Sequence, residues 1–217
     1  MNNISIGSPL PLGSSITPKG VNFSLVATNA EYVEILLFDK EDDAVPEKTY
    51  KLDNKHQTGP YWHAEIYPLK EGAIYGYRVK QKNNEINSDY YKKVLIDPCS
   101  RGIVGWGKYI RKNTIGFVDN TNSCLKSVVC DRKLFNLRDF PRPKHSWEET
   151  IIYELHIEAF THYEDDEKSN FKKFLKKIPY LKELGITAIE LLPIFCFDPN
   201  DAPNGLQNFW GYSPINW

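Results

Sequence analysis

The chain has 217 residues, 41% of them hydrophobic and 25% charged, which is ordinary for a soluble globular protein with one large or two small domains. Its 27 basic and 28 acidic side chains give a formal net charge of -1, so charge offers no case for nucleic acid or an anionic membrane as a partner. A neutral partner fits this composition better.

The start of the chain carries no recognisable targeting signal. Residues 1–5 lack a basic stretch followed by an apolar core, and no run approaches the roughly 20 apolar residues of a spanning helix, so we expect a cytoplasmic location. The cysteines form no C-x-x-C pair, which favours reduced thiols over disulfides or a zinc site. They are Cys99, Cys124, Cys130 and Cys196. We expect no metal and no cofactor.

The first part of the chain predicts short strands separated by turns. Residues 7–20 are rich in Gly, Pro and Ser and indicate turn and extended structure. Alternating or apolar runs then predict strands at 21–25, 32–38, 48–52, 61–67 and 74–79. Strands at this spacing are typical of an immunoglobulin-like β-sandwich, which we expect to span residues 1–98.

The middle of the chain is irregular. Residues 99–149 mix Gly, Asn and Lys with short apolar runs, and we interpret them as a linker that packs between domains and holds at most one short strand. The acidic runs 41–43 and 164–167 are typical of solvated loops.

Residues 151–193 predict a strand, a helix and a second strand. The run from Thr150 to Ile157 is β-branched and apolar, and Ile186 to Ile194 resembles it. Between them, apolar residues recur at helical spacing with lysines on the other side. The apolar positions are Phe171, Phe174, Leu175, Ile178, Leu181 and Leu184.

The ends of this helix also leave signals. Ser169 suits an N-cap and Gly185 a left-handed C-cap, while Pro179 should kink or restart the helix. The two strands should lie parallel with a right-handed crossover. One such unit cannot cover both faces of its strands, so either the chain stops early in a larger α/β domain or another molecule supplies the rest.

The last stretch leaves from the carboxyl end of the second predicted strand. Its Pro, Gly and Asn content excludes a helix over residues 195–214. In parallel α/β folds, ligands bind at this end of the strands.

Eight segments, in order, resemble the N-terminal part of isoamylase-type glycogen and starch debranching enzymes. They are residues 20–23, 33–39, 75–78, 96–98, 152–156, 180–185, 190–193 and 208–214. The resemblance implies a sandwich of carbohydrate-binding module family 48, followed by a (β/α)8 barrel of glycoside hydrolase family 13 that cleaves α-1,6 linkages with retention. Branching enzymes and trehalohydrolases share some of these signals, but the loop leading into Asn208-Phe-Trp-Gly-Tyr212 looks more like isoamylase. The implied fold is therefore multidomain, β plus α/β, with the first βαβ unit of a truncated barrel at residues 150–217.

The resemblance also bears on chemistry. A retaining glycosidase needs a nucleophile and an acid/base carboxyl roughly 5 Å apart, and the family carries them on the fourth and fifth barrel strands. A barrel takes about 250 residues, of which this chain holds about 70 after the sandwich and linker. We therefore expect no catalytic residue within the chain and no activity of the chain alone.

Two substrate-binding positions are candidates. The resemblance implies that Tyr212 stacks on a glucose ring, the alternative being a tyrosine packed within a loop. Trp62, with Tyr61, Tyr75 and Tyr77, could form a glycan-binding face, but alternate positions on a strand point to opposite faces, so some of these rings belong to the core. Phe209 and Trp210 are interpreted as packing residues.

Other constellations favour structural roles. Glu154 and Glu190 lie in predicted strands and are interpreted as buried, hydrogen-bonded carboxylates rather than a catalytic pair. His156 and His162 flank Glu158 without the helical spacing of a metal site, so a structural His156 is favoured.

Three functional hypotheses follow. The first is a shortened debranching enzyme whose partner is an α-glucan such as glycogen, amylopectin or a branched maltodextrin. The second is a non-catalytic glucan-binding or regulatory protein. The third is a gene remnant, or one half of a split enzyme whose barrel is completed by a second chain.

Overall fold

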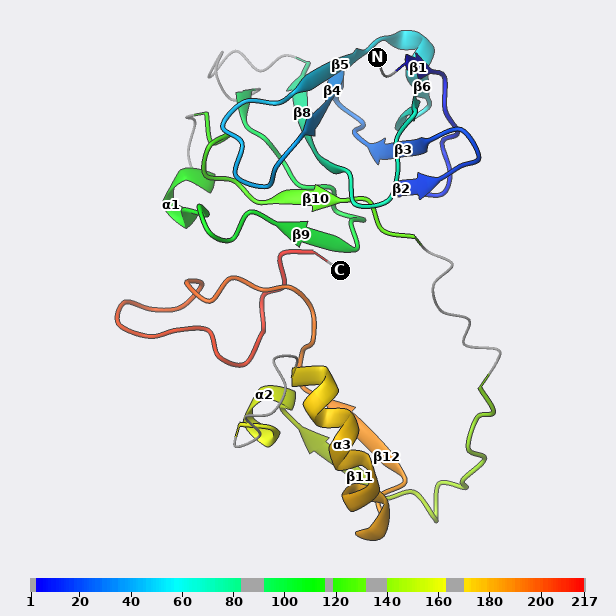
Figure 1. The fold of residues 1–217 in the computed structure, drawn as a ribbon, viewed down its shortest axis with the longest axis vertical. Coiled ribbons are helices and arrows are strands. Elements are labelled where there is room, and N and C mark those ends of the chain that lie inside the picture. The colour runs from blue at the N-terminus through cyan, green and yellow to red at the C-terminus, as the bar shows by residue number, and fades with distance from the viewer. Residues whose placement is uncertain (1–2, 83–91, 116–118, 132–139, 163–169, 217) are drawn as a thin grey trace. The chain divides into compact units, whose positions relative to one another are not determined.

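The computed structural model describes residues 3–82, 92–115, 119–131, 140–162 and 170–216. The chain divides into two compact units, residues 1–135 with 216–217, and residues 136–215 (Figure 1). The expected N-cap Ser169 and the acidic run 164–167 lie outside the described residues.

The first unit is built from two antiparallel sheets (Figure 1). One sheet has the order β1-β7-β3-β2, with β6 paired to β7. Its strands are β1 (Asn3–Ser5), β2 (Gly13–Ile16), β3 (Val21–Val26), β6 (Gln57–Thr58) and β7 (Tyr61–Tyr67). The other sheet has the order β5-β4-β8-β10-β9. It contains β4 (Ala30–Phe38), β5 (Lys48–Leu52), β8 (Ile74–Gln81), β9 (Gly102–Val104) and β10 (Lys126–Val128). The short helices η1 (Asn54–His56) and α1 (Arg111–Thr114) lie in connections.

The core of this unit is filled from both sheets. Trp62 and Phe23 come from the first sheet and Tyr75 and Tyr77 from the second, and all four side chains are essentially inaccessible. The ring of Tyr75 meets those of Phe23 and Tyr77 edge-to-face, at centroid distances of 4.9 and 5.8 Å. Since burying a side chain of this kind stabilises a fold by about 1.5–3 kcal/mol, these rings dominate the packing. The β-sandwich expected from the sequence is present.

The sandwich continues beyond the boundary that the sequence suggested. All five predicted strands are present, but the second sheet also takes in β9 and β10, from the segment expected to be a linker. Strand β10 pairs with β8 through Ser127↔Tyr75. If the sandwich ended at residue 98, Tyr77 would still pair with Leu95, but the part of the β8 edge at Tyr75 and Ile74 would lose its partner. Strands β9 and β10 therefore complete the sheet.

A buried carboxylate ties the end of the expected sandwich to this added strand. Asp97 is 1% exposed, and its Oδ2 accepts a 2.7 Å hydrogen bond from the Tyr75 hydroxyl and lies 3.5 Å from that of Tyr77. Its Oδ1 accepts from the Cys99 backbone N–H at 2.8 Å, and its own N–H donates to Ser127 Oγ at 2.9 Å. Asp97 therefore joins β8, β10 and the chain that follows β8.

The two tyrosines remain donors to this carboxylate. Burial, and then the charge of Asp97, raises the pKa of Tyr75 and of Tyr77 well above the ordinary value. A second titratable core residue is His63, whose Nε2 lies 2.9 Å from Thr58 Oγ1 and whose pKa is lowered by burial.

The loop after β4 is held by cations from the added segment. The ammonium of Lys126, a residue 1% exposed, donates to the Glu41 carbonyl at 2.8 Å and lies 4.8 Å from the centre of the Phe38 ring. Lys108 Nζ lies 3.3 Å from Asp42 Oδ2, and this hydrogen bond lowers the pKa of Asp42.

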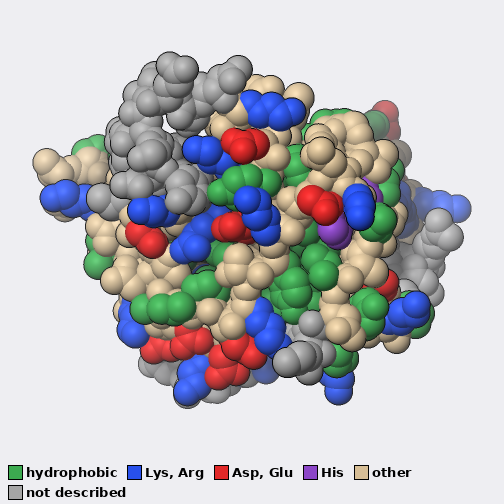
Figure 2. All heavy atoms as spheres, turned by 90° about the horizontal axis from the view of Figure 1, so that it is seen from above, with side chains coloured by type: hydrophobic (Ala, Val, Ile, Leu, Met, Phe, Trp, Pro, Cys, Tyr) green, Lys and Arg blue, Asp and Glu red, His purple; other side chains and the backbone are tan. Residues whose placement is uncertain are grey.

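On the face of the molecule seen in Figure 2, basic and acidic side chains are interspersed, with hydrophobic ones between them.

The second unit is the predicted strand, helix and strand. Strands β11 (Ile152–Leu155) and β12 (Ala188–Leu191) pair in parallel, with Tyr153 opposite Ile189 and Leu155 opposite Leu191. Helix α3 (Asn170–Glu183) contributes Phe174 and Leu181 to a small core with Leu155 and Ile157. A second helix, α2 (Ile157–Phe160), follows β11 directly.

The ends of α3 follow local rules closely. Gly185 has φ +87°, its N–H donates to the Lys182 carbonyl, and the Ile186 N–H donates to the Leu181 carbonyl, which is the Schellman arrangement. The predicted C-cap is confirmed. Of the two outcomes predicted for Pro179, a kink or a restart, the restart does not occur, because α3 runs continuously through this residue. Proline removes one N–H donor, and the remaining turns and the apolar face of α3 hold the helix together.

We predict unequal stability effects for the two tyrosines that face Asp97. Tyr75→Phe should lower the free energy of unfolding of the first unit by about 2 kcal/mol, because it removes a short bond to a buried carboxylate, whereas Tyr77→Phe should cost less than about 1 kcal/mol. Urea unfolding would measure both, with Tyr61→Phe on β7 as a control. Equal losses for the two variants would show that the Asp97 bond at 2.7 Å carries no special weight.

Candidate functional site

The candidate site lies in the loops that follow β11 and β12, at the carboxyl ends of the parallel strands. His156, the first residue after β11, caps α2: its Nδ1 accepts the Ala159 backbone N–H at 3.2 Å. The neutral imidazole that makes this bond therefore carries its proton on Nε2. The predicted run continued to Ile157, but β11 ends two residues earlier, at Leu155, because the chain turns into α2 at His156.

Three rings meet at this position. The imidazole of His156 stacks on Phe209, with centroids 4.6 Å apart and planes 27° apart. Trp210 meets both rings edge-to-face, at 5.8 Å from His156 and 5.4 Å from Phe209. Phe209 and Trp210 pack as expected, yet they remain 43% and 55% exposed. The cluster thus anchors the long loop and still presents aromatic surface.

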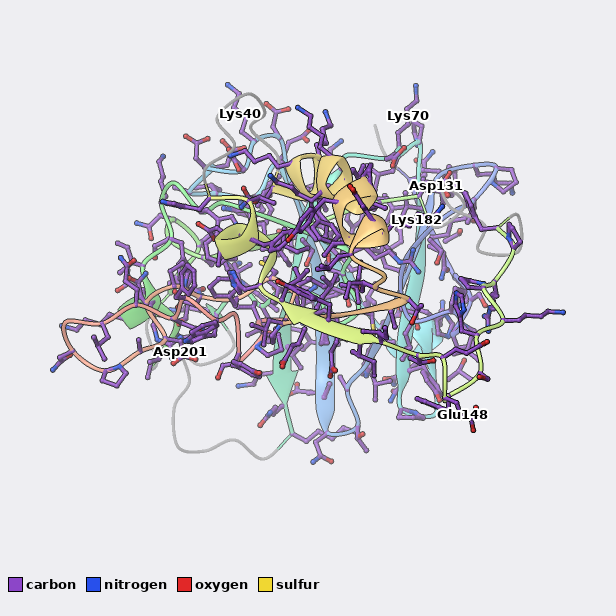
Figure 3. All side chains as sticks on the ribbon, turned by 90° about the horizontal axis from the view of Figure 1, so that it is seen from below. Lys40, Lys70, Asp131, Glu148, Lys182 and Asp201 are labelled. Atoms are coloured by element: carbon purple, nitrogen blue, oxygen red, sulfur yellow. The ribbon has the colours of Figure 1, made fainter. Side chains whose placement is uncertain are left out.

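Asn208 organises the tip of that loop. Its backbone N–H donates to the Pro199 carbonyl at 2.8 Å, its Nδ2 donates to the Tyr212 carbonyl at 2.6 Å, and its Oδ1 accepts the Gly211 N–H at 3.2 Å. One amide side chain therefore closes residues 208–212 into a turn. In Figure 3, which shows the side chains as sticks, Asp201 marks the outer part of this loop and Lys182 projects from α3.

The base of the loop is closed by backbone bonds. Phe197 and Pro214 form an isolated antiparallel bridge, and the Ile215 N–H donates to the Cys196 carbonyl at 2.7 Å. Burial raises the pKa of the Cys196 thiol, which favours the protonated thiol over the nucleophilic thiolate. Residues 196–215 form a loop closed at its neck.

Two positive φ angles shape the turn that carries Tyr212. Gly211 has φ +77°, and a Cβ at this position would lie 3.0 Å from the Pro193 carbonyl oxygen and 3.3 Å from the Phe197 ring. Ser213 has φ +64°, which is uncommon outside glycine. Tyr212, between them, is 58% exposed. The structure thus places its ring in solvent, on a backbone held on both sides.

A small hollow adjoins the ring cluster. It has a volume of about 140 Å³ and is bounded by His156 and Glu158 from the first loop and by Pro193, Phe195 and Phe197 from the second. This volume is well below the roughly 300–1,000 Å³ of sites that enclose a small molecule. The exposed rings, rather than this hollow, are the features able to contact a sugar chain.

The rings of the sandwich do not join this site. Trp62 is 1% exposed and its Nε1 donates to the Ala27 carbonyl at 3.2 Å, which corrects the expectation that it could serve as an exposed glycan platform. Tyr75 and Tyr77 are equally buried, and Tyr61 is half-buried. These rings are buried because they lie on the faces of β7 and β8 that point into the core between the two sheets, where Trp62, Tyr75 and Tyr77 pack.

The two strand glutamates differ from expectation. Glu154 and Glu190 are register partners on β11 and β12, but both are exposed rather than buried. The neighbouring residues Tyr153, Leu155 and Leu191 pack towards α3, so the glutamates occupy the opposite face of the strand pair. That face is not covered within the described part of this unit.

The structure provides no metal-binding cluster at the histidines. Among the described residues, no group of three or more His, Cys, Asp or Glu side chains could hold an ion. His156 is used as a helix cap and a stacking partner. The described ranges also contain no helix with both the length and the apolar character needed to cross a bilayer.

The structural role expected for His156 is confirmed, but the sequence did not predict its particular contacts, nor the part played by Asn208. The usual N-cap residues are Ser, Thr, Asp and Asn. His156 is none of these, so the sequence gave no signal that its side chain would accept the Ala159 N–H. Asn208, three residues before Gly211, does match an Asn turn pattern and could have been found.

The described residues form a β-sandwich, followed by a parallel strand pair whose loops carry exposed rings. Residues 11–100 match the family model described as carbohydrate-binding module 48, the isoamylase N-terminal domain. The sequence-based resemblance to this family is thereby confirmed for the sandwich. The added strands β9 and β10 lie beyond the matched residues.

Solved structures with the same fold come from streptococcal and Paenibacillus proteins. The pneumococcal glycogen-degrading virulence factor SpuA, in a product complex, matches with a TM-score of 0.66 at 21% identity, over 88% of this chain and 20% of its own. The Group B Streptococcus pullulanase SAP with maltotetraose matches at 0.64 and 21% identity, over 86% and 24%. A Paenibacillus barengoltzii pullulanase matches at 0.62 and 20%, over 88% and 28%. This chain therefore spans between 20% and 28% of the length of these proteins, and at this identity the likeness shows the fold.

We predict that the tight packing around Gly211 holds the Tyr212 turn. Gly211→Ala should speed hydrogen exchange of peptides within 196–215, because the added Cβ meets the Pro193 carbonyl and the Phe197 ring. Gly205→Ala is the matched control: its φ is +85°, but nothing lies within 4 Å of the added Cβ. If both variants exchanged alike, the backbone conformation rather than the packing would set the order of this loop.

Proposed function

We propose that residues 1–217 are the N-terminal portion of an α-glucan debranching enzyme of isoamylase type, with an incomplete (β/α)8 barrel after the sandwich. The family match over residues 11–100 carries this proposal. The parallel β11-β12 pair, with its crossover helix, supports it because a barrel of this kind is built from such units. The substrates proposed are glycogen, amylopectin and branched maltodextrins, and the proposed location is cytoplasmic.

Tyr212 is the residue proposed to contact the glucan. Its ring is exposed at the carboxyl end of the strand pair, where ligands bind in parallel α/β folds, and an aromatic face suits the C–H face of a pyranose. His156 and Asn208 act as positioning residues, since the first stacks beneath the loop and the second closes its turn. Trp210 offers a second exposed ring beside it.

The chain alone is proposed to be catalytically incompetent. A retaining glycosidase needs two carboxyls about 5 Å apart with different environments, one ionised and one protonated. Glu154 and Glu190 are neighbours, but both are exposed to solvent within the strands and do not form an enclosed pair. The acidic residues would then come from further strands, on a longer polypeptide or on a second chain.

A second candidate function is non-catalytic glucan binding or regulation. The observation that favours it is the match of the sandwich to a carbohydrate-binding module, which does not depend on a barrel. The coding sequence that flanks residues 1–217 distinguishes the two, because only the enzyme hypothesis requires further barrel strands with acidic residues.

The enzymatic proposal is tested by reconstitution. Residues 1–217 alone should release no reducing ends from glycogen, amylopectin or pullulan, whereas joining or mixing them with the polypeptide encoded by the flanking sequence should restore debranching. In the restored enzyme, Tyr212→Ala should lower kcat/KM by about 100-fold or more, whereas Tyr212→Phe should retain most of it, because stacking needs the ring and not the hydroxyl. Activity of the chain alone after rigorous removal of amylases would refute the proposal, as would a restored activity that Tyr212→Ala leaves unchanged.

A further inference from the structure

A second pair of rings, the exposed Trp106 and the half-buried Tyr109, lies on the sandwich unit, in the connection between β9 and β10. This connection begins with a turn in which the N–H groups of Lys108 and Tyr109 donate to the carbonyls of Gly105 and Trp106. Gly105 has φ +97°, and a Cβ there would lie 3.0 Å from the Cys124 carbonyl, so the turn is fixed against the start of β10. The position of the two aromatic side chains is therefore set by backbone geometry.

The two rings form a corner. Trp106 and Tyr109 have centroids 5.5 Å apart and planes inclined by 71°. Trp106 is 38% exposed, although an indole with a packing role is normally far more buried. A sugar ring can stack on the face of one such side chain and lean against the other, since aromatic faces attract apolar C–H groups.

A hollow of about 350 Å³ lies beside this corner. Its walls are Gly107, Lys108, Tyr109, Ile110, Asn113, Asn122 and Ser123. This volume falls at the lower end of the roughly 300–1,000 Å³ of small-molecule sites, and the mixture of one aromatic ring with amide and hydroxyl groups suits a polyhydroxylated ligand. The Asn113 Nδ2 donates to Ser123 Oγ at 2.9 Å, which holds that amide in place, whereas the Asn122 side chain is exposed.

The electrostatics favour a neutral ligand. Lys108, the charged residue in the wall, pairs with Asp42 Oδ2 at 3.3 Å and donates to the Asp42 carbonyl at 3.2 Å. A phosphate or carboxylate would have to compete with Asp42 for this ammonium. Hydroxyl groups can instead accept from its remaining N–H without breaking the pair.

We propose that Trp106, Tyr109 and the hollow bounded by Lys108, Asn113 and Asn122 form an additional α-glucan-binding site. It lies outside the residues that match the family model, and its residues are distinct from the Tyr212 loop. The choice of glucan rests on the proposed function, whereas the rings, the hollow and the charge balance point to a neutral sugar. Such a site would hold a branched polymer at a second point, so that its benefit is an increased effective concentration rather than chemistry.

The test is binding by the unmodified chain and by matched tryptophan variants. Isothermal titration with maltoheptaose, and affinity electrophoresis in glycogen, should show binding that Trp106→Ala weakens at least tenfold. Trp147→Ala is the matched control, because Trp147 is 85% exposed in the other unit and should leave affinity unchanged. Cellohexaose, with β-1,4 linkages, should bind at least tenfold more weakly than maltoheptaose.

A folding defect must be separated from lost binding. The thermal unfolding midpoint should be the same for Trp106→Ala and the unmodified chain. If the two midpoints differ, a second variant, Asn122→Ala, tests the site instead, because it changes only an exposed side chain. Asn122→Ala should weaken binding several-fold. No binding by the unmodified chain, or binding that Trp106→Ala and Asn122→Ala leave intact, would overturn the proposal. If Tyr212→Ala abolished binding while Trp106→Ala did not, this site would fail and the proposed function would stand.

Discussion

The buried carboxylate of Asp97 is the constraint on which the first unit depends. A carboxylate removed from water is costly unless its oxygens are satisfied, and here the donors come from β8 and from the chain that follows it. The bond from the Asp97 N–H to Ser127 Oγ then places β10 beside β8. A residue at the apparent end of the sandwich thus helps to bring β10, and with it β9, into the same sheet.

Strands β9 and β10 also hold neighbouring segments of the sandwich unit in place. Lys126, on β10, reaches back to the loop after β4, and the turn after β9 presents Trp106 and Tyr109. A linker could not hold two rings in a defined corner, because its backbone groups would be solvated and mobile. The proposed sugar-binding surface therefore depends on the closure of the sheet.

The two units differ in how completely they bury their apolar surface. The sandwich encloses its aromatic core between two sheets. The second unit buries only a small cluster around Leu155 and Phe174, and Phe171, Leu175 and Ile152 remain more than half exposed. Phe171 and Leu175 lie on α3 and Ile152 lies on β11, so both the helix and the strand keep exposed apolar side chains. The order of the Tyr212 loop accordingly rests on local devices, namely the His156 stack and the Asn208 turn.

Sequence reasoning succeeded where a pattern repeats locally. The alternation in β3, β7 and β8 and the helical spacing of α3, with Gly185 at its C-cap, determine those elements through side chains only a few residues apart. It failed where a contact between residues far apart in the chain determines whether a strand forms or which face is buried. β2 reads Gly-Ser-Ser-Ile, with no apolar alternation, and it forms because β3 offers it a partner. The burial of Trp62 depends on which face of β7 meets the second sheet. The amino-acid composition of the strand does not predict which face that is.

At the candidate site, Tyr212 could be identified from the sequence motif that contains it. The contacts that hold its loop in place could not be predicted. His156 and Phe209 are more than 50 residues apart in the chain, and their stacking follows from the parallel register of β11 and β12. The exposure of Glu154 and Glu190 likewise follows from which face α3 covers.

The central structural claim is that residues 99–130 complete the sandwich instead of linking it to the next domain. It is tested most directly by comparing two fragments, residues 1–100 and 1–135, by thermal unfolding and by the dispersion of amide signals in NMR. The longer fragment should unfold in one cooperative transition with well-dispersed signals. The shorter one, which lacks Ser127 and the strand that pairs with β8, should be much less stable or unfolded. Equal stability of the two fragments would contradict the claim, because Asp97 and the edge of β8 would then need nothing from β10.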